Sequence, residues 1–172
     1  MGRAMAESFS PLRLPQEKAA RYASLAEEVV AVLAGEADPV ARMATVSSML
    51  AAAFPHFLWT GFYRVDPSLP DQLIVGPYQG QLGCLRIAVG RGVCGTSAAR
   101  RETLIVPDVE AFDGHIACDS RSRSEIVLPV FDAAGDLQGV FDVDSAELAA
   151  FDETDAQGLQ AILSCVFGPS AR

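Results

Sequence analysis

The hydrophobic pattern of this chain changes its period at Pro55, and that change restricts the fold more than any other feature. Before Pro55, apolar residues recur at helical spacing in two stretches. The first runs from Gln16 to Gly35, a candidate C-cap, and the second begins at Asp38 and Pro39, a cap followed by proline. After Pro55, short runs rich in aromatic and β-branched residues alternate with turn residues. Two helices are therefore expected to precede a β-rich region.

Six strands are expected in that region, in "LWTGFYRV", "DQLIVGPYQG", "CLRIAV", "TLIVPDV", "EIVLPVFD" and "LQGVFDVDS". The last two form a hairpin joined at "AAGD", and the longest irregular stretch runs from Glu110 to Arg123. We expect "GRGVCGTSAARRE" to be a glycine-rich loop that ends in a helical turn. A final helix begins at Asp152, with Asp155 as its capping-box partner. This order predicts an α+β fold, with a largely antiparallel sheet of about six strands flanked by helices.

The chain has 172 residues, enough for one domain of ordinary size. We expect a single domain over residues 16–168 and a loose arm over residues 1–15, which hold two prolines and little periodicity. No apolar stretch is long enough for a signal peptide or a membrane span, which predicts a cytoplasmic protein. A net charge of −9 argues against nucleic acid or an anionic membrane as partner, because both require clustered lysine and arginine.

Three carboxylates are candidates for one site. If residues 139–145 form a strand, Asp142 and Asp144 share a face, and Glu125 begins the neighbouring strand of the hairpin. On a solvent-exposed face these aspartates would simply be hydrated. If they are buried together, their carboxyl pKa values rise, and the cluster would bind an ammonium group or supply a proton. Mg²⁺ or Ca²⁺ is a third option, although no calcium-loop spacing is present.

The four cysteines do not occupy equivalent positions. Cys165, in "LSCVF", is expected to be a small buried hydrophobic residue. Cys84 starts a strand, Cys94 lies in the glycine-rich loop, and Cys118 lies in the long irregular stretch, three residues after His115. The three cysteines and the histidine of this group are potential zinc ligands. Their C-x9-C and H-x2-C spacings, however, match no common zinc module. We therefore expect no resident metal.

A thiol beside acids and further thiols suits one kind of redox chemistry. A thiolate attacks an electrophilic sulfur or oxygen centre, an acid protonates the departing oxygen, and the sulfenic acid condenses with a second cysteine. An external thiol then opens the disulfide by exchange. Peroxides and sulfoxides are the two natural substrate classes. His115, three residues before Cys118, is a candidate to help activate that thiol, although sequence does not give their geometry.

The segments "WTGFY", "GPYQGQLGC", "RGVCGTSA", "DGHIACDSRSRSEIVLPV" and "GVFDVDS", in this order, resemble the free methionine-(R)-sulfoxide reductases, which are built on a GAF domain. The resemblance covers residues 59–145, and the flanking helices fit the GAF plan. It departs from the family at Tyr78, where phenylalanine is usual. All five segments together are highly specific, whereas each alone would be weak.

The resemblance implies roles for the cysteines and for the histidine. Cys118 matches the catalytic cysteine. Cys84 and Cys94 match the cysteines that form the disulfide with it, and members of the family differ in which is used first. His115 belongs to the substrate-binding loop, which we expect it to shape through hydrogen bonds rather than act as acid or base. No cofactor is implied, because thioredoxin reduces the disulfide.

The resemblance also implies a substrate, the free amino acid methionine (R)-sulfoxide. Glu125, Asp142 and Asp144 match the acids that hold its sulfoxide oxygen and ammonium group. Trp59 and Tyr63 match aromatic residues that line the pocket, where the indole covers the S-methyl group. Backbone N–H groups of "GHIAC" are suited to its carboxylate. Homodimers are common in the family, so a homodimer is implied.

Two other functions are compatible with these residues. GAF domains frequently serve as regulatory modules, so a non-catalytic sensor of a small molecule or of oxidants is one alternative. A ligand sensor has no need of three cysteines, however. A thiol peroxidase is the other alternative, because it would direct the same chemistry at a peroxide. Sequence alone does not decide which of Cys84 and Cys94 resolves first, or which carboxylate is protonated.

Overall fold

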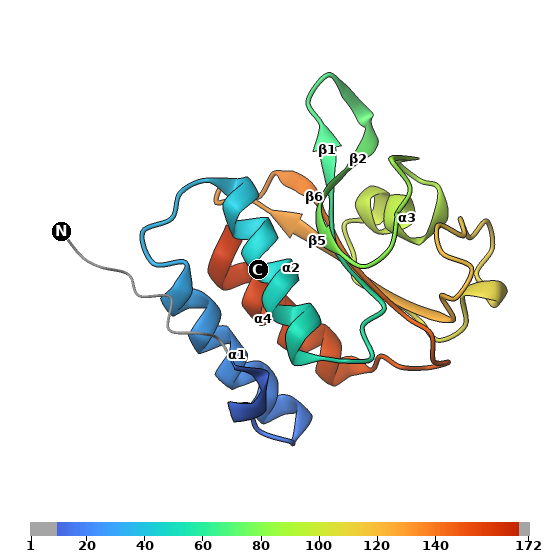
Figure 1. The fold of residues 1–172 in the computed structure, drawn as a ribbon. Helices are drawn as coiled ribbons and strands as arrows, with labels where there is room; N and C mark the ends of the chain where they lie inside the picture. The colour runs from blue at the N-terminus through green and yellow to red at the C-terminus, as the bar shows by residue number, and fades with distance from the viewer. Residues whose placement is uncertain (1–9, 169–172) are drawn as a thin grey trace.

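Six antiparallel strands form one sheet in the computed structural model, which describes residues 10–168 (Figure 1). The strands are β1 (Trp59–Asp66), β2 (Leu69–Gln79), β3 (Arg86–Ala88), β4 (Leu104–Val106), β5 (Ser124–Phe131) and β6 (Leu137–Ser145). Their order is β3-β2-β1-β6-β5-β4. Each of the six segments predicted to be a strand contributes one, so the predicted α+β architecture is confirmed.

Helices cover both faces of this sheet. Three long helices, α1 (Lys18–Val32), α2 (Pro39–Ala53) and α4 (Glu153–Phe167), lie together on one side of the molecule, and the short α3 (Gly92–Arg100) lies on the other (Figure 1). Single turns of 3-10 helix span Pro11–Arg13 and Val109–Ala111. No helix in residues 10–168 is long and apolar enough to cross a membrane.

The predicted helix starts are confirmed by their caps. The carboxylate of Asp38 accepts a hydrogen bond from the backbone N–H of Ala41 at 2.9 Å. Asp152 and Asp155 form the predicted capping box at the start of α4. Asp155 also accepts hydrogen bonds from the hydroxyl of Tyr22 at 2.9 Å and from Lys18 at 2.7 Å, which tie α1 to α4.

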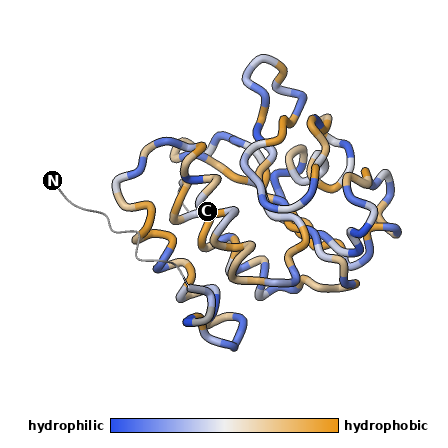
Figure 2. The backbone as a smooth tube through the Cα atoms, in the orientation of Figure 1, coloured by the Kyte–Doolittle hydropathy of each residue, from blue (hydrophilic) through white to orange (hydrophobic). Residues whose placement is uncertain are grey.

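The strands are apolar on both faces, so the sheet separates two cores. The main core lies under α1, α2 and α4, whose apolar residues are visible in Figure 2, and it includes Phe141 and Val143 of β6. The smaller core lies under α3 and includes Val140 of β6. The alternation predicted for β6 is therefore confirmed. Asp142 belongs to the face of the smaller core, and the functional site is built there.

The segment around Cys94 differs from its prediction, because α3 is a nine-residue helix rather than a loop with a final turn. Its glycines are required by tertiary contacts. Gly92 has a φ of +59°, and a Cβ on Gly95 would lie 2.3 Å from the carbonyl oxygen of Ala88. Both residues look like helix breakers in the sequence, yet Gly92 provides the left-handed backbone at the start of the helix and Gly95 lets the helix approach β3 closely.

Cys165 also differs from its prediction, because it is exposed rather than buried. The helical period of α4 turns Leu159, Ile162, Leu163 and Val166 toward the main core and leaves position 165 on the outer side. Apolar neighbours in sequence are therefore no guide to the burial of this thiol.

The loose arm expected over residues 1–15 lies partly outside the described residues, which begin at residue 10. Its described part is structured: Pro11–Arg13 form one turn of 3-10 helix, and Leu14 is 4% exposed in the main core. Burial of a leucine side chain contributes about 2 kcal/mol, enough to hold this segment against α1 and its neighbours.

Candidate active site

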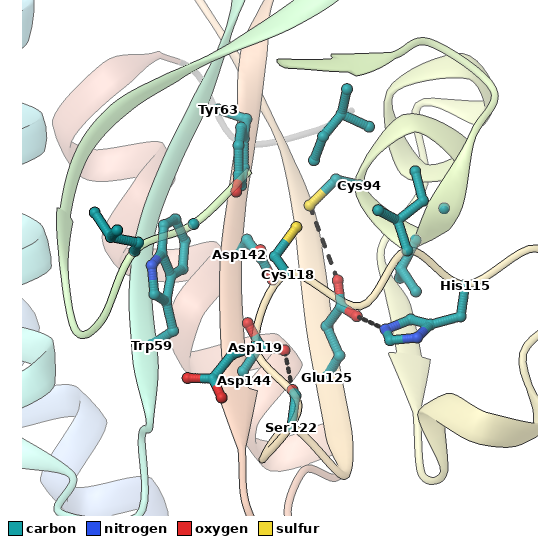
Figure 3. A pocket seen from close by; sticks show the side chains of 16 residues that line it. Trp59, Tyr63, Cys94, His115, Cys118, Asp119, Ser122, Glu125, Asp142 and Asp144 are labelled. Atoms are coloured by element: carbon teal, nitrogen blue, oxygen red, sulfur yellow. Dashed lines mark hydrogen bonds and ion pairs between the residues drawn. The ribbon is translucent and has the colours of Figure 1, made fainter. Parts of the chain in front are cut away.

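A small cavity lies between the face of the smaller core, α3 and the loops that carry Cys84 and Cys118 (Figure 3). Its volume is about 30 Å³. Eight of the side chains predicted for the site line it: Trp59, Tyr63, Cys94, His115, Cys118, Glu125, Asp142 and Asp144. Cys84 joins them through its bond to Cys118. The structure therefore brings the whole predicted set together.

The three acids meet because β5 and β6 are paired in one register. Glu125 lies opposite Asp144, and Val127 lies opposite Asp142, so all three carboxylates project from the same face. Trp59 lies opposite Asp144 on β1, which adds the indole to this face. Glu125 and Asp142 are each only 5% exposed. The acids are therefore desolvated, not hydrated at the surface.

Burial changes the protonation of this cluster. It raises the pKa of Glu125 and of Asp142 well above the usual range, and repulsion from Asp144 adds to the rise. Burial also raises the pKa of Asp144 to about 6, although a hydrogen bond from Ser122 and the nearby His115 oppose the shift. Because three such acids cannot all ionise together, the cluster holds at least one carboxyl proton at neutral pH.

One oxygen of the cluster has no partner. Among the described residues, Oδ1 of Asp142 is buried and makes no hydrogen bond. The two oxygens of Glu125 are better served: Oε1 accepts a long hydrogen bond from the thiol of Cys94 at 3.9 Å, and Oε2 lies 3.6 Å from Nε2 of His115. A buried acceptor without a donor costs about 1–3 kcal/mol, so Asp142 is prepared for a ligand that donates.

The cysteines occupy two different environments. Cys84 and Cys118 form a disulfide with a Cα–Cα distance of 5.3 Å, and Cys118 is exposed. Cys94 is a buried free thiol on α3. Burial and the charges of Asp142 and Glu125 raise the pKa of Cys94, which keeps it protonated. An accessible redox pair therefore lies beside a thiol that is a poor nucleophile.

The aromatic wall is a stack of three rings. The indole of Trp59 lies between Tyr63, at a centroid distance of 5.5 Å, and Tyr78, at 5.0 Å. Its N–H donates to the backbone carbonyl of Gln81 at 3.1 Å. Tyr78, the residue that departs from the family pattern, keeps its ring in the stack. A Cβ on Gly83 would lie 2.9 Å from the Tyr63 hydroxyl, so a larger residue before Cys84 would displace this ring.

Comparison with known proteins agrees with this geometry. The GAF domain family model matches residues 23–164. The chain is 43% identical to the free methionine-R-sulfoxide reductase of Escherichia coli (strain K12), over 83% of this chain and 84% of that protein. The chain belongs to the free methionine-R-sulfoxide reductase family. It is therefore an oxidoreductase, and the alternative of a non-catalytic sensor is set aside.

Two further proteins are similar to this chain over most of its length. The structure of free methionine-R-sulfoxide reductase from Neisseria meningitidis, in complex with its substrate, is 45% identical with a TM-score of 0.84; the match covers 88% of this chain and 89% of that one. GAF domain-containing protein A of Dictyostelium discoideum is 47% identical, over 85% of this chain and 90% of that protein. The similarity thus extends over nearly the whole described fold.

Two side chains of this reductase site were missed in the sequence. Ser122 donates a hydrogen bond to Asp144, and Asp119 lines the cavity while it pairs with Arg121 at 2.7 Å. Both lie in the irregular stretch, where no strand or helix period assigns a direction to a side chain. His115 lies in the same stretch, and its Nε2 lies 3.6 Å from Oε2 of Glu125.

Proposed function

We propose that this chain reduces free L-methionine (R)-sulfoxide to L-methionine, with Cys118 as the nucleophile. The observation that carries the proposal is the meeting of Cys118 with Glu125, Asp142 and Asp144 in one cavity, beside the stacked indole of Trp59. Reduction of a sulfoxide needs an attacking sulfur and a proton for the departing oxygen. This cavity holds both.

The first chemical step transfers oxygen from substrate to enzyme. The sulfur of Cys118 attacks the sulfoxide sulfur, the S–O bond breaks, and the oxygen leaves on Cys118 as a sulfenic acid while methionine is released. Glu125 supplies the proton to the oxygen, because burial keeps its pKa high and its carboxyl lines the same cavity as Cys118. Substrate is thereby reduced by two electrons, and Cys118 is oxidised by two.

The second step closes a disulfide. The thiol of Cys84 attacks the sulfenic sulfur of Cys118, and water leaves. The bond between these two cysteines in the structure supports Cys84 as the resolving residue. Cys94 is the other candidate, but its thiol is buried and hydrogen-bonded to Glu125. We assign Cys94 the role of positioning Glu125. A dithiol reductant, proposed to be thioredoxin, then exchanges with the disulfide and restores both thiols.

Substrate binding follows from charge and shape. The unpartnered oxygen of Asp142 supports a hydrogen bond from the substrate ammonium, and Asp144 lies on the same face of the sheet. The indole of Trp59 covers the S-methyl group. Backbone N–H groups of the loop at His115 receive the carboxylate. A requirement for both charged groups would select the free amino acid and exclude a methionine sulfoxide residue within a protein.

The disulfide form is closed to this substrate. Small-molecule pockets usually measure about 300–1,000 Å³, whereas this cavity measures about 30 Å³. We infer that reduction of the Cys84–Cys118 bond lets the loop before Cys84 move and opens the cavity. Substrate binding is then restricted to the form whose nucleophile is free.

The remaining features of the proposal concern the setting of the reaction. The thiols carry both electrons, so no cofactor is required beyond the external reductant. We further propose that residues 16–168 act as one domain, that the protein forms a homodimer, and that it works in the cytoplasm. None of these features alters the chemistry at Cys118.

The test is NADPH consumption in an assay coupled to thioredoxin and its reductase, with each sulfoxide epimer supplied free and within a peptide. We expect turnover of the free (R) epimer alone, and no turnover by Cys118→Ser. Hydrogen peroxide as the sole oxidant tests the thiol peroxidase alternative. Equal turnover of both epimers, or full activity of Cys118→Ser, would overturn the proposal.

A further inference from the structure

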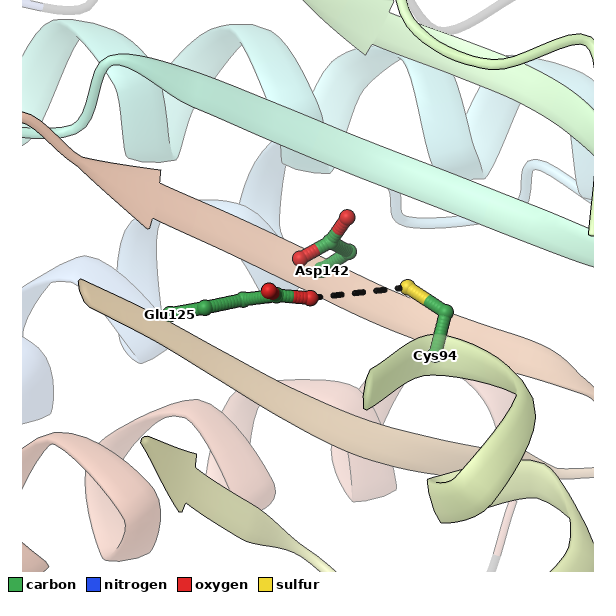
Figure 4. A group of neighbouring side chains, drawn as sticks. All are labelled: Cys94, Glu125 and Asp142. Atoms are coloured by element: carbon green, nitrogen blue, oxygen red, sulfur yellow. Dashed lines mark hydrogen bonds between the residues drawn. The ribbon is translucent and has the colours of Figure 1, made fainter. Parts of the chain in front are cut away.

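Three potential metal ligands converge in the cavity from separate elements (Figure 4). The thiol of Cys94 comes from α3, and the carboxylates of Glu125 and Asp142 come from β5 and β6. One ligand atom of each lies within 4.8 Å of those of the other two. All three residues are at least nine-tenths buried. Small side-chain movements would place these atoms around a single ion.

The potentially positive side chain described next to this group is His115, 3.6 Å from Glu125. The described residues that line the cavity include no lysine or arginine. Oδ1 of Asp142 is buried and has no hydrogen-bond donor, an observation separate from the spacing of the three groups, so this oxygen is available to a cation as well as to the substrate ammonium. Buried carboxylates in proteins are normally paired or coordinate a metal.

The chemistry of the three groups selects the class of cation. Mg²⁺ and Ca²⁺ prefer all-oxygen sites with six or more ligands, whereas a thiolate favours softer ions such as Zn²⁺. Three protein ligands, with a water in the fourth position, are the usual arrangement in catalytic zinc sites. A cavity of about 30 Å³ has room for the water that completes it.

We infer that Cys94, Glu125 and Asp142 bind one thiophilic divalent cation, of the class of Zn²⁺ or Cd²⁺, and that this ion inhibits the enzyme. The thiol of Cys94 gives up its proton to the solvent on binding, and no electron transfer is involved. The ion occupies Glu125, the proton donor, and Asp142, the ammonium ligand. Inhibition by competition with substrate rests on the proposed function, whereas binding of the ion does not.

Binding is tested on the disulfide form, in which Cys84 and Cys118 cannot coordinate metal. The background variant is Cys165→Ser, which removes the exposed thiol and leaves Cys94 as the sole free cysteine. Titration with Cd²⁺ is followed by the ultraviolet absorption of the thiolate–metal bond. We expect saturation at about one ion per chain. Calorimetric titration with Zn²⁺ gives the affinity.

Matched variants decide whether the ion sits in this cluster. Cys94→Ser in the same background should abolish the absorption band, and Asp142→Asn should weaken binding by at least about 10- to 100-fold, the loss seen even for groups behind a metal's ligands. Asp136→Asn, at an exposed position, is the charge control and should bind normally. Absence of a saturable band, or binding that survives both cluster substitutions, overturns the site.

Competition is tested separately, by methionine release from the reduced enzyme in a single turnover. Zn²⁺ should raise the sulfoxide concentration needed for half-maximal release, a chelator should reverse the effect, and Cys94→Ser should resist Zn²⁺ relative to its own metal-free rate. If Cd²⁺ binds the disulfide form but Zn²⁺ does not compete with the sulfoxide, the inhibitory role is overturned and the metal site itself stands. Failure of all methionine release, with Cd²⁺ binding intact, would instead count against the proposed function.

Discussion

Glu125 on β5 lies directly opposite Asp144 on β6, and the carboxylates of both project into one buried cavity. A facing pair of like charges destabilises a sheet. The described residues that line the cavity supply no lysine or arginine to neutralise the pair. The arrangement therefore favours protonation of an acid, which is the state that a sulfoxide reductase needs in a proton donor.

Replacement of Glu125 by glutamine tests the donor directly. The variant keeps the shape and hydrogen-bonding reach of the side chain but cannot release the proton, so methionine release in a single turnover should slow by about 10²–10⁴-fold. Asp136→Asn serves as the control for loss of an exposed carboxylate. An unchanged rate in Glu125→Gln would transfer the donor role to another group.

The pH dependence of the chemical step follows from the same raised pKa. A general acid works in its protonated form, and burial keeps Glu125 protonated well above the usual range for a glutamate. The donor limb of the single-turnover rate should therefore stay flat through the acidic range and fall as the pH rises past the raised pKa. In Glu125→Gln this limb should disappear. A limb that persists in the variant would report a different acid.

Asp144 should make the folded protein less stable as the pH rises. Its pKa is raised from the ordinary value of 3.8 to about 6, so the folded state binds this proton more tightly than the unfolded state does. The contribution of this proton to stability is fully present below the unfolded pKa. It is lost as the pH rises through the folded pKa, and the loss is about 3 kcal/mol. Urea unfolding of the disulfide form, at pH values below the ordinary pKa and above the folded pKa of Asp144, measures the loss.

Asp144→Asn is the matched variant for that measurement. It removes the titration while it retains an acceptor for the hydroxyl of Ser122. The free energy of unfolding should then change less with pH between the two pKa values of Asp144, and the variant should be more stable than the wild type near neutral pH. Parallel pH profiles for the two proteins would contradict the assignment of the slope to Asp144.

The two candidate resolving cysteines should separate in a count of methionine released per enzyme. With thioredoxin present, Cys84→Ser should release about one methionine per chain and then stall, because no disulfide with Cys118 forms. Cys94→Ser should continue through many turnovers, at a rate that reflects the altered position of Glu125. Cys165→Ser is the thiol control. A stall in Cys94→Ser with sustained turnover in Cys84→Ser would reverse the two roles.

Much of the site follows from the period of its strands. Alternation along β6 separates Asp142 from Phe141, and the hairpin with β5 adds Glu125 to the same face. These relations depend only on neighbouring residues and one short hairpin, so they can be predicted from a single sequence. The irregular stretch has no period, and Ser122 was therefore missed although it donates to Asp144. The choice between Cys84 and Cys94 as partner of Cys118 likewise depends on loop positions in space.

Other differences arise where tertiary contacts override local preference. Leu14 lies in a proline-containing segment without a clear period, yet its side chain is buried in the main core. Cys165 lies among apolar neighbours, yet the period of α4 turns it outward. Glycines at the start of α3 predicted a loop, because glycine is a poor helix former when no partner surface is considered.

Gly95 turns that last difference into a test of the fold. Helix propensity alone predicts that Gly95→Ala would stabilise α3 by about 1 kcal/mol. The new methyl group, however, would lie 2.3 Å from the carbonyl oxygen of Ala88 and 3.1 Å from the backbone nitrogen of Gly90. Backbone atoms cannot rotate away as a side chain can, so α3 would have to separate from β3, at a cost of about 1–3 kcal/mol.

We therefore expect Gly95→Ala to lower the free energy of unfolding and to impair activity, because α3 carries Cys94 into the cavity. Ala99→Gly, at an exposed position of the same helix, is the control for propensity and should destabilise by no more than about 1 kcal/mol while activity is retained. The measurements are urea unfolding and the coupled turnover assay on both variants. A more stable and fully active Gly95→Ala protein would mean that the close packing of α3 on β3 does not determine the position of Cys94.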